Sequence, residues 1–574
     1  MWWWPALGTR PPDPASLERP WLRSYPPGVP PTYRLPAVPV TRFLDDAVRD
    51  FPHQTALVAG GDAIDHVRFR DQVDLVATAL VDHGIGPGDR VLVVLPNLLS
   101  TPVVMFAVWR VGAVLVPLDP ETRPDRVAAV AEDAEVVAVV APPQVVRTLA
   151  DHAAAPAIVL VVADDGWIAR HRRRFPRLGD LPGLGRRSRP VPRRRASRGL
   201  TDPGVPLAEA LVDVVPRVPP PPPDVASLAL LAYRPRNAEL RGVRLTHANL
   251  VAAAFQARLW IPDVQAGRER VLVADGLHDL QTLVLGALVG LLAAATVVLV
   301  DDPDASTLAR AIERESPTLL PIGPRRLGDL LDQGDAARRD LTSLRVVLAV
   351  GAPVDPLLAA DVERRTGGAR VREGFGSAEA GPLTHAQPVY GRAVRDSMGL
   401  PVSSTVAAVV DPDDVATLQG PGEPGLLAIH GPQVADGYWR RDDATAAAFV
   451  DEWLITDDLV SVDADGVFRH VGRRDEVFER HGTLISPRHV EATLERHPGV
   501  RRAGVVGDPV GGLLFAAVVP TRRNRPGPDE LLTHCRVHLD WPAVPDRVTM
   551  VDELPETDAG DLARDVLRHQ LAGR

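Results

Sequence analysis

The sequence predicts a large α/β domain followed by a smaller α+β domain. Over residues 38–160 and 226–470, helical patterns alternate with short runs of β-branched residues. Such alternation is typical of parallel sheets covered by helices. After residue 471 the order changes to strands lying between helices, which indicates a separate unit. We therefore divide the chain into a Pro- and Trp-rich tail, a large domain and a small domain, with bounds 1–36, 37–471 and 472–574.

In the large domain, the β-branched run at 90–95 predicts a strand, 103–111 a helix and 113–116 a second strand. Residues 283–300 carry no charge over 18 positions, which is the lower limit for a membrane span. Two glycines interrupt this segment, and it ends in the β-branched run 296–300. A buried helix followed by a buried strand is therefore the preferred interpretation.

An Arg/Pro-rich insertion at 170–224 interrupts the alternation. Its first part, 170–198, holds twelve arginines and few apolar residues, and a stiff proline run follows at 219–223. One interpretation is a peripheral patch for anionic lipid headgroups, where each cation contributes ~1 kcal/mol. The other is a solvated loop. Both remain open.

The small domain is predicted to contain a helix at 487–497, strands at 502–506 and 513–519, a helix at 529–539 and a C-terminal helix after Leu562.

Composition excludes several classes of function. The net charge of -10 argues against nucleic-acid binding. The single cysteine, Cys535, excludes a disulfide framework and a cysteine-based metal site and favours the reducing cytoplasm. All 64 Lys+Arg residues are arginine, so chemistry that requires a lysine amine is excluded.

Several segments together resemble the adenylate-forming (AMP-binding) superfamily, in particular the bacterial long-chain fatty acid–CoA ligases. They include GDRVLVVLPN (88–97), VREGFGSAEAGPLTHAQP (371–388), GPQVADGYWRRDDATAAAF (431–449), GRRDEVF (472–478) and VDELPETDAGDLAR (551–564). The resemblance implies the adenylate-forming enzyme fold, with an AMP-binding domain and a small mobile C-terminal domain. It also implies that ATP and a fatty acid or other acyl carboxylate form an acyl-adenylate, from which coenzyme A takes the acyl group.

The resemblance assigns part of a nucleotide site to 374–379. Gly374, Phe375 and Gly376 match the adenine-binding segment, with Phe375 as the stacking ring. Glu379 matches the glutamate that binds magnesium, whereas the preceding phosphate-binding threonine is Ala378 here.

Further nucleotide contacts are implied near the domain boundary. Asp458 matches the ribose-binding carboxylate, although Asp457 replaces the glycine before it and adds negative charge that opposes nucleotide binding. Arg473 matches a second ribose contact, and Asp475 matches the hinge.

The phosphate loop departs from the family in LLAYRPRNAELRGVRLTHANL (230–250). A cradle of backbone N–H groups requires glycine-like freedom, but Pro235 removes a donor and fixes φ. Gly242 remains, and Arg241 replaces the loop lysine. Arg234, Arg236 and Arg241 form a new anion site in one interpretation; in the other, the loop is simply degraded.

Two further positions concern catalysis. His278 matches a histidine that borders the acyl pocket, and it is a weak candidate for a chemical role because such histidines more often pack or gate. Asp561 stands where the family has the lysine that bridges the carboxylate and the α-phosphate. Because this substitution reverses the charge, we expect a degenerate ligase or pseudoenzyme with lost or impaired adenylation. The alternative is an active ligase with an arginine-rebuilt phosphate site.

Overall fold

The computed structural model describes residues 10–150, 158–170, 204–212, 214–217, 222–236, 239–301, 304–332, 338–391, 393–394, 396–508, 512–521, 525–555 and 562–572. The chain divides into two compact units. The larger comprises Arg19–Val406 and Ile429–Leu454; the smaller comprises Met1–Glu18, Ala407–Ala428 and Ile455–Arg574. The tail 1–36 and the boundary at 471/472 remain predictions.

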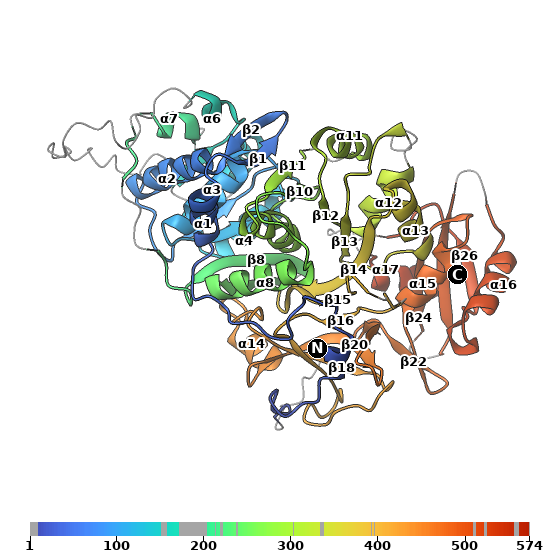
Figure 1. Cartoon of the computed structure of the whole chain (residues 1–574). Coiled ribbons are helices and arrows are strands. Elements are labelled where there is room, and N and C mark those ends of the chain that lie inside the picture. Colours follow the sequence, from blue (N-terminus) through green and yellow to red (C-terminus); the bar gives the residue numbers. More distant parts are fainter. Residues whose placement is uncertain are drawn as a thin grey trace. The chain divides into compact units, whose positions relative to one another are not determined.

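Two mainly parallel sheets form the frame of the larger unit (Figure 1). In the described part of the chain, one has the order β16-β15-β14-β13-β12-β10-β11-β1-β2 and the other β7-β6-β5-β3-β4-β8-β9. The first uses β1 (Thr55–Ala59), β2 (Asp62–Asp65), β10 (Arg270–Val273), β11 (Thr296–Leu299), β12 (Leu319–Ile322), β13 (Val346–Val350), β14 (Arg370–Ser377), β15 (Gly381–Ala386) and β16 (Leu400–Pro401). The second uses β3 (Arg90–Val93), β4 (Val114–Pro117), β5 (Ala138–Ala141), β6 (Ile158–Val161), β7 (Val205–Pro206), β8 (Leu228–Arg236) and β9 (Glu239–Thr246).

Both sheets are buried on both faces because helices cover each side. Consecutive side chains of a strand point to opposite faces, so each strand contributes to two cores. Val297 of β11 joins the core between the sheets, whereas its neighbour Val298 packs under the outer helices. Val93 and Leu92 of β3 divide in the same way. This explains why the strands read as continuous apolar runs rather than as alternating patterns.

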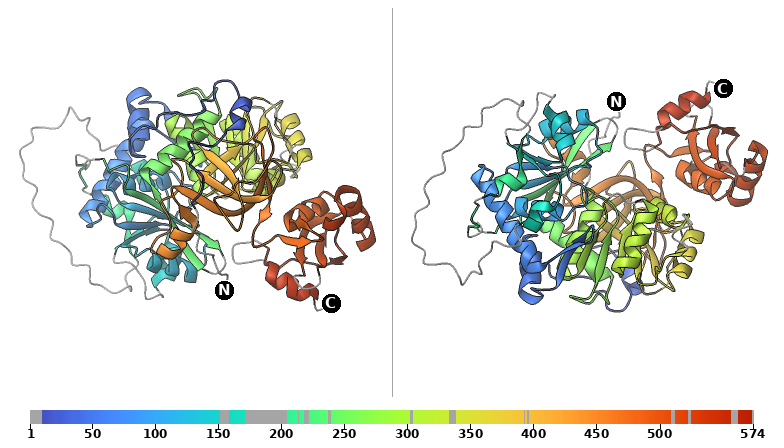
Figure 2. Two further views of the ribbon diagram at one scale, coloured as in Figure 1. Left: turned by 90° about the horizontal axis from the view of Figure 1, so that it is seen from below. Right: turned by 90° about the horizontal axis from the view of Figure 1, so that it is seen from above.

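Helices form three layers around the two sheets, and Figures 1 and 2 show them around the strands of the larger unit. The middle layer is α1 (Arg42–Asp50), α2 (His66–Asp82), α3 (Ser100–Arg110), α8 (His247–Trp260), α9 (Leu280–Thr282), η3 (Leu283–Leu288) and α10 (Val289–Leu292). The outer layers are α4 (Pro124–Asp133) and α5 (Pro143–Ala150) on one sheet and α11 (Ala305–Glu315), α12 (Pro324–Asp332) and α13 (Pro356–Arg365) on the other. The predicted α/β class and the elements near 90–116 are confirmed.

The uncharged segment 283–300 forms the buried helix η3–α10 followed by β11, as predicted. Within the described residues, no helix is long and apolar enough to cross a membrane. The insertion 170–224 lies mostly outside the described residues. Its described part includes β7, which pairs with β6 at the edge of the sheet, and α7 (Leu207–Ala210).

The smaller unit contains the sheet β24-β25-β26, and all of its predicted elements are confirmed. These are α15 (Pro487–Glu495), β24 (Val500–Gly507), β25 (Leu514–Pro520), α16 (Pro528–His538) and α17 (Arg564–Ala572). The short strand β26 (Arg547–Met550) lies parallel to β25, and four residues carry too little pattern to predict it. The remaining strands of the described residues fall in one unit or the other or cross the division between them. They are β17 (Val406–Val410), β18 (Gly425–His430), β19 (Phe449–Val450), β20 (Trp453–Val462), β21 (Phe468–Arg473), β22 (Phe478–Arg480) and β23 (Thr483–Ile485).

Candidate functional site

The predicted phosphate loop is a β-hairpin rather than an open loop. β8 and β9 pair antiparallel as far as Arg236↔Glu239, with Pro235 opposite Leu240 and Arg234 opposite Arg241. The side chains of Arg234 and Arg236 lie outside the described residues. A paired hairpin differs from a cradle of converging N–H groups, because the ladder directs alternate backbone groups at the opposite strand.

A hydrogen bond from Tyr233 links this hairpin to the last residue of α4, Asp133. The Tyr233 hydroxyl is buried and donates to Oδ2 of Asp133 at 2.7 Å. Arg441 donates to the other carboxylate oxygen of Asp133 at 2.6 Å, and the Trp439 indole donates to the Asp133 carbonyl at 3.1 Å. The tyrosine ring also lies over Gly242, where an added Cβ would come within 2.7 Å of the ring. The retained glycine is therefore explained by packing against a bulky residue, without a ligand.

The exit of the hairpin holds the neighbouring segment in place. Thr246 and Asn249 form a reciprocal capping box at the start of α8. The Asn249 amide also donates to the carbonyls of Pro432 and Val434, at 3.1 and 2.8 Å. The next amide of that segment, from Ala435, donates to the Glu379 carbonyl at 2.9 Å. The hairpin exit thus positions the backbone of the candidate magnesium ligand.

Glu379, Tyr438 and Arg241 come together beside the hairpin. The Tyr438 hydroxyl donates to Oε1 of Glu379 at 3.3 Å, and the Arg241 guanidinium lies 5.7 Å above the Tyr438 ring. Val243 pairs with Tyr438, which explains this proximity. Among the described residues, no group of three or more His, Cys, Asp or Glu side chains is placed to hold a metal ion. A lone carboxylate fits magnesium only when nucleotide phosphates supply other ligands.

The adenine segment ends strand β14, next to β15. A β-bulge separates Phe375 from the next paired residue, and an added Cβ at Gly376 would lie 2.4 Å from the Pro382 backbone. The Phe375 ring meets the edge of His385 at 6.2 Å. Burial lowers the pKa of His385 to about 3, so this imidazole stays neutral. The close approach of β15 accounts for Gly376, and Gly374 lies in the same pair of strands.

In the smaller unit, Arg473 pairs with the predicted ribose carboxylate, Asp458, and with two neighbouring aspartates. Its guanidinium lies 3.2 Å from Asp457, 3.7 Å from Asp458 and 3.2 Å from the predicted hinge residue Asp475. Burial opposes the charged guanidinium, but Asp458, Asp475 and Asp457 together raise the pKa of Arg473. Asp458 also lies 3.2 Å from His470. Arg473 therefore offsets the local charge of the two adjacent aspartates, and a ribose would have to compete with these pairs.

Asp561, at the catalytic lysine position, lies outside the described residues. The nearest arginine after it in the sequence, Arg564, is partly buried and donates to Glu491 at 3.0 Å. Glu476 lies 3.8 Å from the same guanidinium. Although burial opposes the charge, Glu491 and Glu476 raise the pKa of Arg564. This arginine is already paired and does not offer a free cation in place of the missing lysine.

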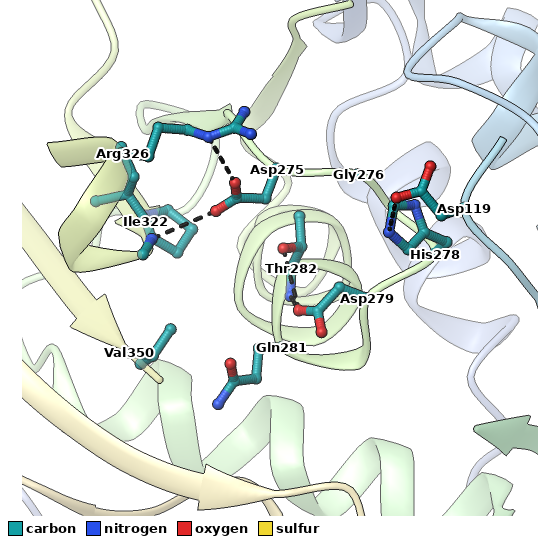
Figure 3. Close-up of a pocket in the computed structure, with 12 residues that line it drawn as sticks. Asp119, Asp275, Gly276, His278, Asp279, Gln281, Thr282, Ile322, Arg326 and Val350 are labelled. Atoms are coloured by element: carbon teal, nitrogen blue, oxygen red, sulfur yellow. Dashed lines mark hydrogen bonds and ion pairs between the residues drawn. The ribbon is translucent and has the colours of Figure 1, made fainter. Parts of the chain in front are cut away.

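His278 lies at a polar cavity of about 320 Å³ in the larger unit (Figure 3). Its Nε2 is 3.4 Å from Asp119, and its buried Nδ1 has no hydrogen-bond partner among the described residues. Across the cavity, Asp275 forms an ion pair of 3.0 Å with Arg326. The cavity lies where β10, β12 and β13 end, the usual ligand-binding edge of a parallel sheet.

Comparison with known protein families identifies the family to which the chain belongs. Residues 44–233 and 238–439 match the AMP-binding enzyme family, and residues 489–561 match the AMP-binding enzyme C-terminal domain. The chain belongs to the AMP-binding enzyme family. The match to this family is interrupted between 233 and 238, where the hairpin replaces the expected loop.

Related AMP-binding proteins are similar over nearly the whole chain. A long-chain-fatty-acid–CoA ligase of Escherichia coli O157:H7 is 27% identical over 97% of this chain and 99% of its own length. A feruloyl-CoA synthase of Amycolatopsis is 30% identical, covering 91% and 96%. The anthranilate CoA ligase AuaEII, solved with anthranoyl-AMP, superposes with a TM-score of 0.78 at 20% identity, covering 95% and 99%. ATP-bound MatB of Rhodopseudomonas palustris gives 0.76 at 22%, covering 92% and 98%. These structures bear out the adenylate-forming fold.

Three residues of this AMP-binding protein's site were missed by the sequence analysis. They are Asp133, which binds Tyr233, Tyr438, which binds Glu379, and Gln281, which lines the cavity. Tyr438 lies in the quoted 431–449 motif and could have been suspected there. Asp133 ends a solvent-facing helix about a hundred residues from its partner, and no local signal connects the two.

Proposed function

We propose that this chain is a long-chain fatty acid–CoA ligase-like protein in which acyl adenylation is lost or strongly impaired, and which acts by binding a ligand or partner. The paired β8–β9 hairpin carries the proposal. Pro235 is part of its ladder, and Tyr233 is held by Asp133 where a small hydroxyl residue is expected. Opening this hairpin around a polyphosphate would break both the ladder and the buried tyrosine contact.

Electrostatics supports the same conclusion. A carboxylate that attacks ATP needs positive charge and fixed donors where negative charge develops. Asp561 places a carboxylate at the position of one such cation, and Arg564 is engaged by Glu491. Loss of one stabilising donor costs ~3 kcal/mol, or ~10²–10³ in rate. Reversal of its charge costs at least as much, although such losses need not add.

A retained nucleotide would use the residues that the fold preserves. Phe375 would contact adenine, Asp458 and Arg473 would contact the ribose, and Glu379 would hold magnesium bound to the phosphates. Magnesium, when bound, would neutralise phosphate charge. Coenzyme A would be the acceptor if adenylation occurs.

The alternative is an active AMP-forming acyl-CoA or acyl-AMP ligase with an arginine-rebuilt phosphate site. One observation favours it: the Arg241 guanidinium lies over Tyr438, whose hydroxyl reaches Glu379. This arrangement keeps a cation beside the candidate magnesium ligand.

Acyl-dependent ATP–pyrophosphate exchange separates the two proposals. With saturated acids from hexanoic to octadecanoic, we expect exchange near background, whereas robust exchange would establish the alternative.

Calorimetry should give an ATP affinity no tighter than high micromolar, and a low-micromolar fit would contradict the damaged phosphate site. Asp561→Lys alone should restore little exchange because the hairpin remains closed.

A further inference from the structure

The cavity next to His278 has an unusual lining for a site that would hold a fatty acyl chain. Carboxylates from Asp119, Asp275 and Asp279 border it, together with the guanidinium of Arg326 (Figure 3). The three carboxylates outnumber the single guanidinium among these lining groups. An apolar chain placed there would take polar groups out of water without replacing their hydrogen bonds.

The carboxylates are held in place before any ligand binds. Asp275 pairs with Arg326 and accepts from the Gly323 amide at 3.3 Å. Asp279 caps α9 by accepting from the Thr282 amide at 3.0 Å. Burial raises the pKa of Asp275, although Arg326 opposes that rise. The negative side of the cavity is therefore built into the ends of the strands and the start of a helix.

A second, independent feature indicates that the cavity receives a polar ligand. The side chain of Gln281 is about nine-tenths buried, lines the cavity and has no hydrogen-bond partner among the described residues. Figure 3 shows its carboxamide below Thr282 and beside Val350, across the cavity from Asp275. An unpaired amide at the wall of a cavity binds water or a ligand. The buried Nδ1 of His278, which also lines the cavity, has no hydrogen-bond partner among the described residues either.

The cavity also lies on the edge that carries the adenine segment. It is bordered by residues that follow β10 and β12 and by the last residue of β13, Val350. Val350 pairs in parallel with Gly374 of β14, so the adenine segment begins at the neighbouring strand end. A small acid could therefore place its carboxylate towards that segment while its other end occupies the cavity.

We infer that the cavity binds a small carboxylic acid whose far end carries a hydrogen-bond donor, an ammonium or a hydroxyl group, rather than an unsubstituted fatty acid. This inference rests on the proposed ligand-binding role and narrows its ligand class. The donor pairs with the Gln281 amide oxygen, and an ammonium also gains from the excess of carboxylates.

Calorimetry with 6-aminohexanoate, 6-hydroxyhexanoate, hexanoate and hexadecanoate tests the inference on the full chain. We expect the amino acid to bind about tenfold tighter than hexanoate, the size of effect expected for a charged hydrogen bond. The hydroxy acid separates the contribution of hydrogen bonding from that of charge. If hydrogen bonding alone decides, 6-hydroxyhexanoate binds as tightly as 6-aminohexanoate. If charge contributes, its affinity lies between those of 6-aminohexanoate and hexanoate.

Gln281→Met removes the polar group at similar length and should reduce amino-acid binding about tenfold while leaving hexanoate binding unchanged. Gln144→Met, at an exposed position on α5, is the matched control. Asp119→Asn, at a partly exposed position, is a second variant in case Gln281→Met fails to fold. The Asp119→Asn substitution should weaken binding of 6-aminohexanoate but not of 6-hydroxyhexanoate.

Equal or tighter binding of the unsubstituted acids overturns the inference, as does amino-acid binding that Gln281→Met leaves unchanged. Absence of binding by every compound at millimolar concentration also overturns it. Exchange assays with the same acids keep the two proposals apart. Exchange driven by the amino acid would end the proposal of impaired adenylation while the ligand class would stand.

Discussion

The side chain of Tyr233 occupies space in the β8–β9 hairpin where a small hydroxyl residue is expected. Its ring covers Gly242, and its hydroxyl reaches Asp133, which also binds Arg441. A small residue at this position would leave the space above Gly242 open and would remove the tyrosine donor to Oδ2 of Asp133, while Arg441 would still bind Oδ1. The substitution thus converts a position expected to serve phosphate into part of the packing between β8 and α4.

Tyr233→Phe should lower the free energy of unfolding by roughly 1–2 kcal/mol, because it removes a buried hydrogen bond to a carboxylate. Denaturant titration measures the change. Tyr33→Phe is the comparison, since the Tyr33 hydroxyl donates to a neutral carbonyl, that of Ala252, at 3.0 Å. A smaller loss for Tyr233→Phe than for Tyr33→Phe would contradict a stabilising role of the Asp133 contact.

Glu373, immediately before the adenine segment, should make stability depend on pH. Burial and the charge of Asp396 raise the pKa of Glu373 from 4.5 to about 7, while the Val354 amide opposes the rise. The folded chain therefore holds this proton more tightly than the unfolded chain. The resulting stabilisation is complete below pH 4.5 and is lost as pH rises to about 7.

Glu373→Gln removes the titrating group. Across this pH window, the free energy of unfolding of the variant should therefore fall by roughly 2–3 kcal/mol less than that of the unsubstituted chain. Chemical denaturation at several pH values measures it. Glu313→Gln is the control, because Arg339 lowers the pKa of the exposed Glu313 and its effect falls below the window. An unchanged pH profile for Glu373→Gln would show that the carboxyl titrates normally.

At the scale of elements, helix α8 connects the hairpin to the Glu379 segment. Asn249 accepts from the amide of Thr246 at 2.9 Å and donates to the carbonyls of Pro432 and Val434. The Thr246 hydroxyl donates to the same carboxamide oxygen at 2.7 Å, so four groups from two segments depend on one carboxamide. The hairpin exit therefore has a structural role that does not require a phosphate.

Asn249→Ala should destabilise the chain by roughly 2–3 kcal/mol, since it removes the cap and leaves two partly buried carbonyls unpaired. Asp304→Ala is the matched control, because Asp304 caps α11 at an exposed site through Thr307 and should cost only ~1 kcal/mol. Thermal or denaturant unfolding compares them. Equal losses would mean that the 432–434 contacts contribute nothing.

At the scale of the whole molecule, charge is distributed unevenly along the chain. The net charge is -10, yet twelve arginines lie within 170–198, of which 171–198 falls outside the described residues. This segment is either a patch for anionic lipid headgroups or a solvated loop, and the two interpretations differ in what they predict for vesicle binding. Lipid binding by such a patch would be screened by salt because it is electrostatic.

Vesicle sedimentation separates the two interpretations. A lipid patch would bind phosphatidylserine-containing vesicles, bind phosphatidylcholine alone only weakly, and lose binding at high salt, whereas a solvated loop would bind neither kind of vesicle. Replacing the arginines at 193–195 by glutamine should weaken binding at least tenfold, from ~1 kcal/mol per cation. Arg42, Arg49 and Arg310, which are exposed, provide a control with the same change in charge. Equal weakening by both variants would show a general charge effect.

The sequence alone determined the fold class, because apolar periodicity and the order of motifs depend only on neighbouring residues. It also indicated Phe375, Glu379, Asp458 and Arg473 as candidates, because each lies within a recognisable local motif. The lysine-free composition and Asp561 were equally visible, and they raised the doubt about catalysis without any coordinates.

Only the tertiary structure decided what these residues contact. The pairing of Tyr233 with Asp133, the sharing of Arg473 among three carboxylates and the unpartnered Gln281 at a polar cavity join residues that periodicity cannot relate. Hydrogen bonds and ion pairs act over a few ångströms of space and not along the sequence. Strand order and register therefore decide which distant residues meet, and those contacts exist only in the folded chain.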